Sequence, residues 1–280
     1  MSETVLAASS GTAAASLWGR LRRSLAGVGR EARRRTRFLL FLASLAWAVV
    51  SQAPRPRSWR RTVRREFRRA LRQAIAGAFS TVLITAALVG VLMVYQALYW
   101  LGAAGQEGLI GSVLVTVLVR EIAPVLIGLI LLGRSGTVAV SEIGRLGLGG
   151  QVRALEAQGL DTFQLLVLPR ACAFAIAAFT LGVLFVIAAL ATGFVAGSLL
   201  EAVRMSIWSF FDRILLAMHA SDFIILPVKL IAVGLLVALT ACLTALTAGE
   251  RDDIASLLPR GFMRGVVMIL LASLALSLAA

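Results

Sequence analysis

Lysine, histidine and cysteine are scarce in this chain of 280 residues, and their scarcity excludes several chemistries. Its one lysine, Lys229, stands in the sequence Leu-Pro-Val-Lys-Leu, so the chain lacks the Gly-Lys-Ser/Thr ending of an ATPase phosphate-binding loop. One histidine, His219, cannot supply the two histidines of a helical zinc motif, and two cysteines cannot form a four-thiolate metal site. If the protein performs energised work, the energy comes from another chain.

Charged residues are also few, at 15% of the chain, whereas 59% of the residues are hydrophobic. A soluble domain has about 25% charged and about 45–50% apolar residues. Here the apolar residues form uninterrupted blocks that are long enough to cross a bilayer. The composition therefore predicts an all-α integral membrane protein with several transmembrane helices.

Five blocks have the length and composition of transmembrane helices: residues 74–98, 109–133, 171–200, 223–248 and 265–280, of which the last is short. The block 38–50 has no charge, but its thirteen residues are fewer than the ~20 that cross a bilayer. We expect this block to lie in the membrane interface or to enter one leaflet.

The net charge of +14 is concentrated at the N-terminal end, where seventeen of the 28 basic residues precede residue 74. In residues 16–37 and 57–72, apolar side chains recur every four residues among arginines, which predicts amphipathic helices. Such helices could bind nucleic acid. Because they lead into apolar blocks, we interpret them as interfacial helices that contact anionic lipid headgroups. The predicted division is a basic region at 1–73 and a transmembrane region at 74–280.

The distribution of arginine between the blocks predicts how the chain crosses the membrane. The loop 99–108 has no arginine, residues 134–170 have four, and the excess alternates with each crossing. The positive-inside rule therefore predicts a cytoplasmic N-terminus and a C-terminus on the opposite side.

Arg120 and Glu121 are ionisable residues inside the second block, where a charged side chain costs ~2.5–3.5 kcal/mol on insertion scales. Neighbouring residues of a helix point about 100° apart, so each of the two needs its own partner. Lys229 is a candidate partner for Glu121, although its long side chain could also reach the outer interface. The pattern indicates either a polar cavity that handles a headgroup or substrate, or a structural ion pair. We expect His219, beside Asp222 in an outer loop, to be solvated.

The segment between the second and third blocks predicts a short helix at 151–158, which Gly159 ends, with Asp161 capping the next helix. A short helix between two spans could bind a soluble partner, or the segment could be an ordinary surface loop. In the third block, Gly193 and Gly197 have the small-xxx-small spacing of close helix contacts, a weak indication of a dimer.

Several motifs together resemble the MlaE/YrbE permeases, the membrane subunits of ABC transporters that work with MCE proteins. They are Val-Arg-Glu-Ile-Ala-Pro-Val at 119–125, Gly-Arg-Ser-Gly at 133–136, Ser-Glu-Ile-Gly at 141–144, Ala-Leu-Glu-Ala at 154–157 and Leu-Pro-Arg at 168–170. Residues 90–96 and the spacing from Asp222 to Lys229 extend the resemblance, which covers about residues 60–250. The chain departs from the family at residues 150–151, 161–162 and 250–260, which predicts a divergent branch.

The resemblance implies a permease homodimer in the bacterial inner membrane, with the C-terminus periplasmic. Two cytoplasmic ABC ATPases would hold ATP and Mg, an MCE protein would sit on the periplasmic side, and this chain would hold no cofactor and no nucleic acid. The cargo would be phospholipid or a similar hydrophobic molecule that moves between the inner and outer membranes.

The resemblance also assigns residues to two sites. The substrate site would contain Arg120, Glu121, Gln96, Tyr99 and Lys229. A cytoplasmic coupling helix between spans two and three would contact the ATPase through Ser141, Glu142, Gly144, Arg153, Glu156 and Gly159.

Two other functions are consistent with the sequence. An ion-driven secondary transporter would use Arg120, Glu121 and Lys229 as a relay, and it would normally show internal repeats, which the sequence lacks. A non-transporting scaffold would anchor envelope proteins through the basic N-terminal helices, with no cavity at Arg120.

Overall fold

The computed structural model describes residues 33, 36–199, 206–248 and 252–279. The chain divides into two compact units, Met1–Trp47 and Ala48–Ala280. The described residues of the first unit are helical, and most belong to the apolar helix Thr36–Gln52. This helix is too short to be a candidate membrane span, as we predicted for residues 38–50, and its place at an interface stays a prediction. The amphipathic helix predicted at 16–37 lies almost wholly outside the described residues.

The second unit is a bundle in which five helical segments are long and apolar enough to cross a membrane, as predicted. The first is α2 (Arg61–Ala103), and the second joins α3 (Ile110–Val113), a π-helical turn (Leu114–Ile122), α4 (Ala123–Leu131), a second π-helical turn (Leu132–Gly136) and α5 (Thr137–Leu148). The third joins a π-helical turn (Phe163–Val167) to α7 (Leu168–Leu199), and the last two are α9 (Asp222–Leu246) and α10 (Ile254–Ala279). Throughout the described residues, the regular structure is helical.

Three helices extend well beyond the apolar blocks that predicted them. α2 begins at Arg61, so the basic stretch and the first span are one helix, and the predicted division after residue 73 falls inside it. The second span continues to Leu148 rather than to residue 133, and α10 begins at Ile254, so the last span is not short. Hydropathy detects only the part of a helix that suits lipid. Arginine, leucine and glutamate are good helix formers, and they let the backbone hydrogen bonding continue into polar sequence.

α2 packs along α7 through small side chains. Every fourth residue of α2 is buried and small: Ala70, Ala74, Ala78, Val82, Ala86, Gly90 and Val94. A Cβ on Gly90 would collide with the backbone of Ala189, and a Cβ on Gly193 would collide with Val94. Small residues let helix backbones approach closely in a membrane. Gly193, which we had associated with a dimer, is therefore used inside one chain.

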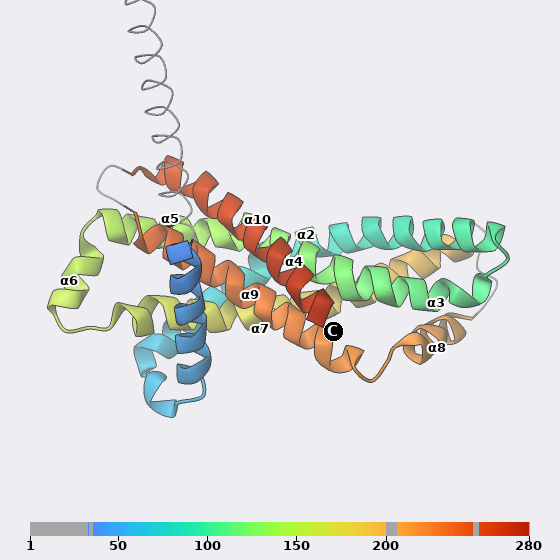
Figure 1. Ribbon diagram of the computed structural model, residues 1–280, viewed down its shortest axis with the longest axis horizontal. Helices are drawn as coiled ribbons and strands as arrows, with labels where there is room; N and C mark the ends of the chain where they lie inside the picture. Colours follow the sequence, from blue (N-terminus) through green and yellow to red (C-terminus); the bar gives the residue numbers. More distant parts are fainter. Residues whose placement is uncertain (1–32, 34–35, 200–205, 249–251, 280) are drawn as a thin grey trace, which may run out of the picture. The chain divides into compact units, whose positions relative to one another are not determined.

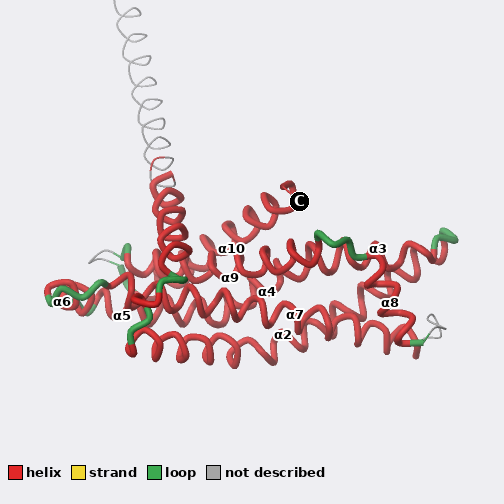
Figure 2. Tube along the Cα trace, turned by 90° about the horizontal axis from the view of Figure 1, so that it is seen from below, coloured by secondary structure: helices red, strands yellow, loops and turns green. Residues whose placement is uncertain are grey.

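Two short helices mark the opposite ends of the bundle. α6 (Gln151–Ala157) lies at one end and α8 (Ile207–Ala217) at the other, in both views of the fold (Figures 1 and 2). Gly150 and Gly159, on either side of α6, have φ of +72° and +74°, which favours glycine. The Asp161 carboxylate accepts a hydrogen bond from the Phe163 N–H (3.0 Å) at the start of the next helix. The predicted short helix, its glycine end and the aspartate cap are all present.

Candidate functional site

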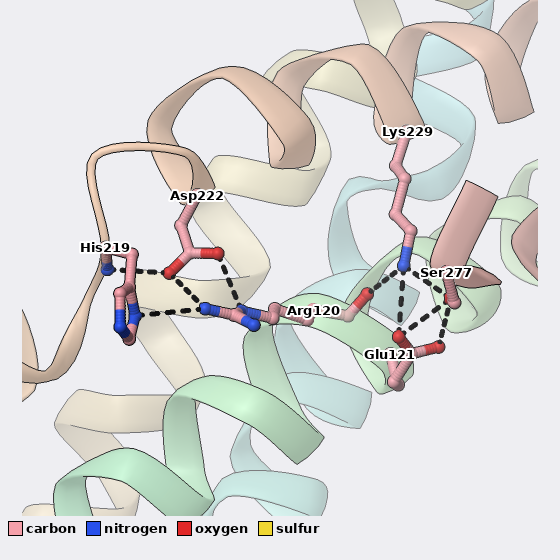
Figure 3. A network of polar contacts seen from close by, with 6 residues as sticks. All are labelled: Arg120, Glu121, His219, Asp222, Lys229 and Ser277. Atoms are coloured by element: carbon pink, nitrogen blue, oxygen red, sulfur yellow. Dashed lines mark hydrogen bonds and ion pairs between the residues drawn. The ribbon is translucent and has the colours of Figure 1, made fainter. Parts of the chain in front are cut away.

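Two ion pairs join the second span to α9 on the side of the bundle nearest α8 (Figure 3). Arg120 and Glu121 lie in the π-helical turn Leu114–Ile122, a rare form of helix that often occurs at functional sites. Their partners are Asp222 and Lys229. These two residues are seven apart, so one face of α9 supplies both partners.

The Lys229 ammonium is fully satisfied inside the protein. It donates to the backbone oxygen of Arg120 (3.0 Å), to Glu121 Oε1 (3.0 Å) and to Ser277 Oγ (2.7 Å). An ammonium has three donors, so each donor has one acceptor. The Ser277 hydroxyl lies 2.8 Å from Oε1 and 2.9 Å from Oε2 of Glu121. Three spans therefore meet at this point, because Ser277 belongs to α10.

The Arg120 guanidinium binds the Asp222 carboxylate through two nitrogens. Nε lies 2.6 Å from Oδ1, and Nη2 donates to Oδ2 at 2.7 Å. The Nη2 hydrogen bond is charge-assisted and therefore strong, whereas the Nε–Oδ1 contact is an ion-pair contact without hydrogen-bond geometry. The His219 N–H also donates to Asp222 Oδ2 (2.9 Å), and the His219 Nδ1 atom is 3.4 Å from Arg120 Nη2.

Exposure divides the four charged residues into two classes. The side chains of Asp222 and Lys229 are 1% and 2% exposed, whereas those of Arg120 and Glu121 are 33% and 47% exposed. The partners on α9 are thus buried, and the residues of the second span reach the surface. The second span therefore presents one partly exposed guanidinium, directed toward Asp222, and one partly exposed carboxylate, directed toward Lys229 (Figure 3). We call these two groups the surface patch.

The structure confirms that Arg120 and Glu121 each have a separate partner and that Lys229 pairs with Glu121. Lys229 does not extend to the outer interface, because its ammonium is held inside the bundle. Arg120 and Glu121 lie toward the α3 end of the second span, because this helix continues to Leu148. His219 is exposed as expected but also contacts the network.

Two members of the network, Asp222 and Ser277, were not predicted from the sequence as partners. The pairing of Asp222 with Arg120 could have been predicted, because Asp222 and Lys229 are seven residues apart and so lie on the same helical face. For Ser277 the sequence carries no such signal, because serine is ordinary in an apolar helix and its contact with Glu121 spans more than 150 residues.

Gln96 and Tyr99, which the resemblance places at the substrate site, lie on the exposed surface of α2. The Tyr99 ring stacks on Tyr95 with a centroid distance of 6.4 Å and meets Trp100 edge-on at 5.6 Å. Within the described part of the chain, no contact joins Gln96 or Tyr99 to the charged network. Their role in binding stays a prediction, and the aromatic cluster is typical of a membrane–water interface.

Ser277→Ala should destabilise the protein measurably. The Lys229 ammonium would lose its shortest contact, and leaving a buried charged donor unpaired costs about 1–3 kcal/mol. Thermal unfolding in detergent measures the effect. Ser198→Ala is the matched control, since the Ser198 hydroxyl bonds only within its own helix at 2.8 Å. Equal unfolding temperatures for wild type and Ser277→Ala would show that this hydroxyl does not hold the network.

The residues assigned to ATPase contact lie on two helices rather than one. Ser141, Glu142 and Gly144 belong to α5, Arg153 and Glu156 belong to α6, and the Gly149–Gly150 turn separates the two groups. α5 is partly buried in the bundle, whereas α6 has no buried residue.

Glu142 is paired with arginines of the bundle, and its contact with an ATPase stays a prediction. Its carboxylate pairs with Arg170 of α7 at 3.2 Å and with Arg69 of α2 at 3.7 Å, beside a small cavity that Gln73 and Ser135 also line. Glu142 therefore links three helices at the α6 end.

The described residues contain no cluster of three or more metal-ligating side chains. Cys172 and Cys242 are both free thiols inside α7 and α9, where cysteine behaves as a small apolar residue.

Comparison with known proteins agrees with the resemblance that the motifs indicated. The family model described as Permease MlaE matches residues 67–279. A probable ABC transporter permease protein of Synechocystis sp. is 31% identical over 165 residues, which is 59% of this chain and 62% of that protein. The intermembrane phospholipid transport system permease protein MlaE of Haemophilus influenzae is 29% identical over 118 residues, 42% of this chain and 44% of that protein.

A protein of Arabidopsis thaliana, the chloroplastic TRIGALACTOSYLDIACYLGLYCEROL 1, is 30% identical over 91 residues, 32% of this chain and 26% of that protein. The aligned regions cover less than two thirds of these relatives. The family match covers most of the chain, so the chain belongs to the MlaE permease family and is a multi-pass membrane protein.

Proposed function

We propose that this member of the MlaE permease family is the membrane subunit of an ABC transporter that moves phospholipid, or a similar hydrophobic molecule, between the inner and outer membranes. The Haemophilus relative is named as a permease of an intermembrane phospholipid transport system, which supports this cargo. A permease is not itself an enzyme. The sequence lacks a phosphate-binding loop, so ATP and Mg would bind to a partner chain.

The observation that carries the proposal is the exposure of Arg120 and Glu121 inside an apolar span. A charged side chain that faces acyl chains costs ~2.5–3.5 kcal/mol on insertion scales, and such residues normally face a bundle interior or a water-filled cavity. A lipid path at the interface of a permease homodimer would supply that surrounding.

The chemistry of the surface patch suits a phospholipid headgroup. A guanidinium binds phosphate with two parallel hydrogen bonds, and a carboxylate attracts an amine. A phosphate at Arg120 would compete with Asp222 for the same nitrogens. Binding and release of the headgroup would therefore open and close the Arg120–Asp222 pair without any covalent step.

The helices offer a mechanical connection from the ATPase to this patch. α6 is exposed and follows α5 directly, and α5 packs against α9 and α10. A Cβ on Gly144 would lie 3.4 Å from Leu257 and a Cβ on Gly147 would lie 3.7 Å from the Ala245 oxygen, so α5 is in ordinary van der Waals reach of α10 and α9 at these positions. α9 and α10 carry Lys229 and Ser277, so a displacement of α6 would reach the network through rigid helices.

The assembly we propose is a permease homodimer in a bacterial inner membrane. It has two cytoplasmic ABC ATPases at the α6 end and an MCE-domain protein on the periplasmic side. Arg145, Arg153 and the arginines of the first turns of α2 support a cytoplasmic α6 end by the positive-inside rule. With five crossings, an N-terminus on the cytoplasmic side puts the C-terminus in the periplasm.

Purification of the whole complex in mild detergent, with mass spectrometry of proteins and lipids, tests this function. We expect an ABC ATPase and a phospholipid to co-purify, and ATP to drive lipid transfer when the complex is reconstituted in vesicles. A scaffold would retain partners without ATP-dependent transfer. An ion-driven transporter would move its cargo without an ATPase, and either result would overturn the proposal.

Glu156→Arg should reduce the ATPase that co-purifies with the permease by at least about tenfold, because losing one partner of a charge pair that an interface buries costs about 2–5 kcal/mol. Glu156 is exposed on α6 and accepts one hydrogen bond, from the Thr162 hydroxyl at 3.1 Å, so the change leaves the core intact. Asp212→Arg, the same charge reversal on exposed α8, is the matched control. Unchanged recovery with Glu156→Arg would remove α6 from the ATPase contact.

A further inference from the structure

Arg134 is an exposed arginine that the charged network does not include. It lies in the π-helical turn Leu132–Gly136, and its Nε donates to the backbone oxygen of Gly77 on α2 at 2.9 Å. This bond fixes the guanidinium against α2. Among the described residues, its terminal nitrogens have no protein acceptor. The side chain therefore presents fixed and unused donors on the surface of the bundle.

The neighbours of Arg134 place it at the polar boundary of the spans. It follows Arg120 by fourteen residues, which is about 20 Å along a helix toward the α6 end. Gly133, next to Arg134, faces Phe262 of α10, because a Cβ on Gly133 would lie 3.8 Å from the Phe262 ring. In the sequence of α10, Phe262 stands between Arg260 and Arg264. At the level of Gly133 and Phe262, the apolar part of these helices ends and arginines follow.

The surface of α2 beyond Gly77 is apolar. Ile84, Leu88, Val91 and Tyr95 follow Gly77 by 7, 11, 14 and 18 residues, so all lie on the same face of the helix. Ile84 and Leu88 are 63% and 69% exposed. Ile84 stands about 10 Å along the helix from Gly77, within the ~15 Å of one leaflet of the hydrocarbon core, and Leu88 stands about 17 Å away, near the bilayer centre.

We propose that Arg134 binds the phosphate of a membrane phospholipid in the leaflet at the α6 end, and that Ile84 and Leu88 contact its acyl chains. The guanidinium has the charge and the paired donors that phosphate requires, at the depth where headgroups lie. The apolar stripe continues from it toward the bilayer centre, as acyl chains do. This site is about 20 Å from the Arg120 patch, so it binds a separate lipid at the other leaflet. It depends on the membrane placement of the helices and not on the transport proposal.

Native mass spectrometry of the purified protein tests the site, with phosphatidylglycerol and a diacylglycerol of the same chains as probes. Arg134→Gln should weaken phosphatidylglycerol binding about tenfold, since a hydrogen bond to a charged group is lost, and should leave diacylglycerol binding unchanged. Arg145→Gln, which removes an exposed arginine of α5 nearer the α6 end, should change neither. Equal binding of phosphatidylglycerol to wild type and Arg134→Gln would overturn the proposal.

Three further outcomes keep the test decisive. A phospholipid with a photoreactive group beside its phosphate should label residues 77–84 or 133–138 of the wild-type protein, and labels confined to other segments would contradict the site. Displacement of the lipid by excess inorganic phosphate would assign Arg134 to a soluble anion instead. Dissociation of the oligomer in Arg134→Gln, with unchanged lipid binding, would assign it to a contact between copies of the chain.

Discussion

Lys229→Met should destabilise the protein strongly and abolish lipid transport. The substitution leaves the Glu121 carboxylate without its cation. It also removes the hydrogen bonds that the Lys229 ammonium donates to the backbone oxygen of Arg120 and to the Ser277 hydroxyl. Removing one partner of a buried ion pair costs about 3–5 kcal/mol. We expect a value toward the lower end, because the Glu121 side chain is 47% exposed. Unfolding in detergent and ATP-driven lipid transfer by the reconstituted complex measure the two effects.

A double variant separates the structural and the functional contributions of this pair. Lys229→Met with Glu121→Gln removes both charges, so it should recover most of the stability, as buried pairs replaced by neutral residues often do. Lipid transport should stay lost, because the carboxylate of the surface patch is missing. Recovery of transport together with stability would show that the pair only holds the helices together.

Much of the fold could be predicted from the sequence because lipid imposes a simple condition on it. A helix of about 20 apolar residues is the one open-ended structure that satisfies its backbone hydrogen bonds in a bilayer, so each long apolar block indicates one span. The helix ends were less predictable. Arg61–Arg72 and Thr137–Leu148 are helical although they are polar, and hydropathy carries no signal for such extensions.

The charged network was predictable only where a rare residue limited the choice. Lys229 is the one lysine of the chain, and Glu121 is the acidic residue that lies inside a predicted apolar block. The scarcity of both kinds of residue therefore predicted this pair. Arg120 had many acids to choose from, and its partner Asp222 depends on how α9 packs against the second span. The contact of Ser277 depends on α10 ending at the level of Glu121, which local sequence does not encode.

The π-helical turns show a second limit of periodic patterns. Arg120 and Arg134 both lie in turns that are wider than an α-helix, where the 3.6-residue period no longer gives the direction of a side chain. Arg120 was predicted instead from its charge inside an apolar block and from the motif at 119–125. The resemblance grouped Ser141 with Glu156 on one helix, although the turn at Gly149–Gly150 separates them.

Arg120→Ala should reduce lipid transport at least about tenfold while the complex still assembles. Arg120 offers the exposed guanidinium of the patch, and a hydrogen bond to a charged group contributes about 1.5–3 kcal/mol. The variant leaves Asp222 buried, but the first turn of a helix favours an acidic residue, and the His219 N–H still donates to its carboxylate. We therefore expect a smaller loss of stability than with Lys229→Met. ATP-driven lipid transfer in vesicles and recovery of the ATPase on the purified permease measure transport and assembly.

Arg213→Ala is the matched control, because Arg213 is an exposed arginine on α8 at the same end of the bundle, outside the network. It should transport lipid like the wild type, so a loss specific to Arg120→Ala cannot come from the net charge of that surface. Adding Asp222→Asn to Arg120→Ala removes the unpaired carboxylate and should restore stability without restoring transport. Transport at the wild-type level in Arg120→Ala would exclude this guanidinium from the lipid path. Loss of the ATPase from the purified complex would assign it to the architecture of the permease instead.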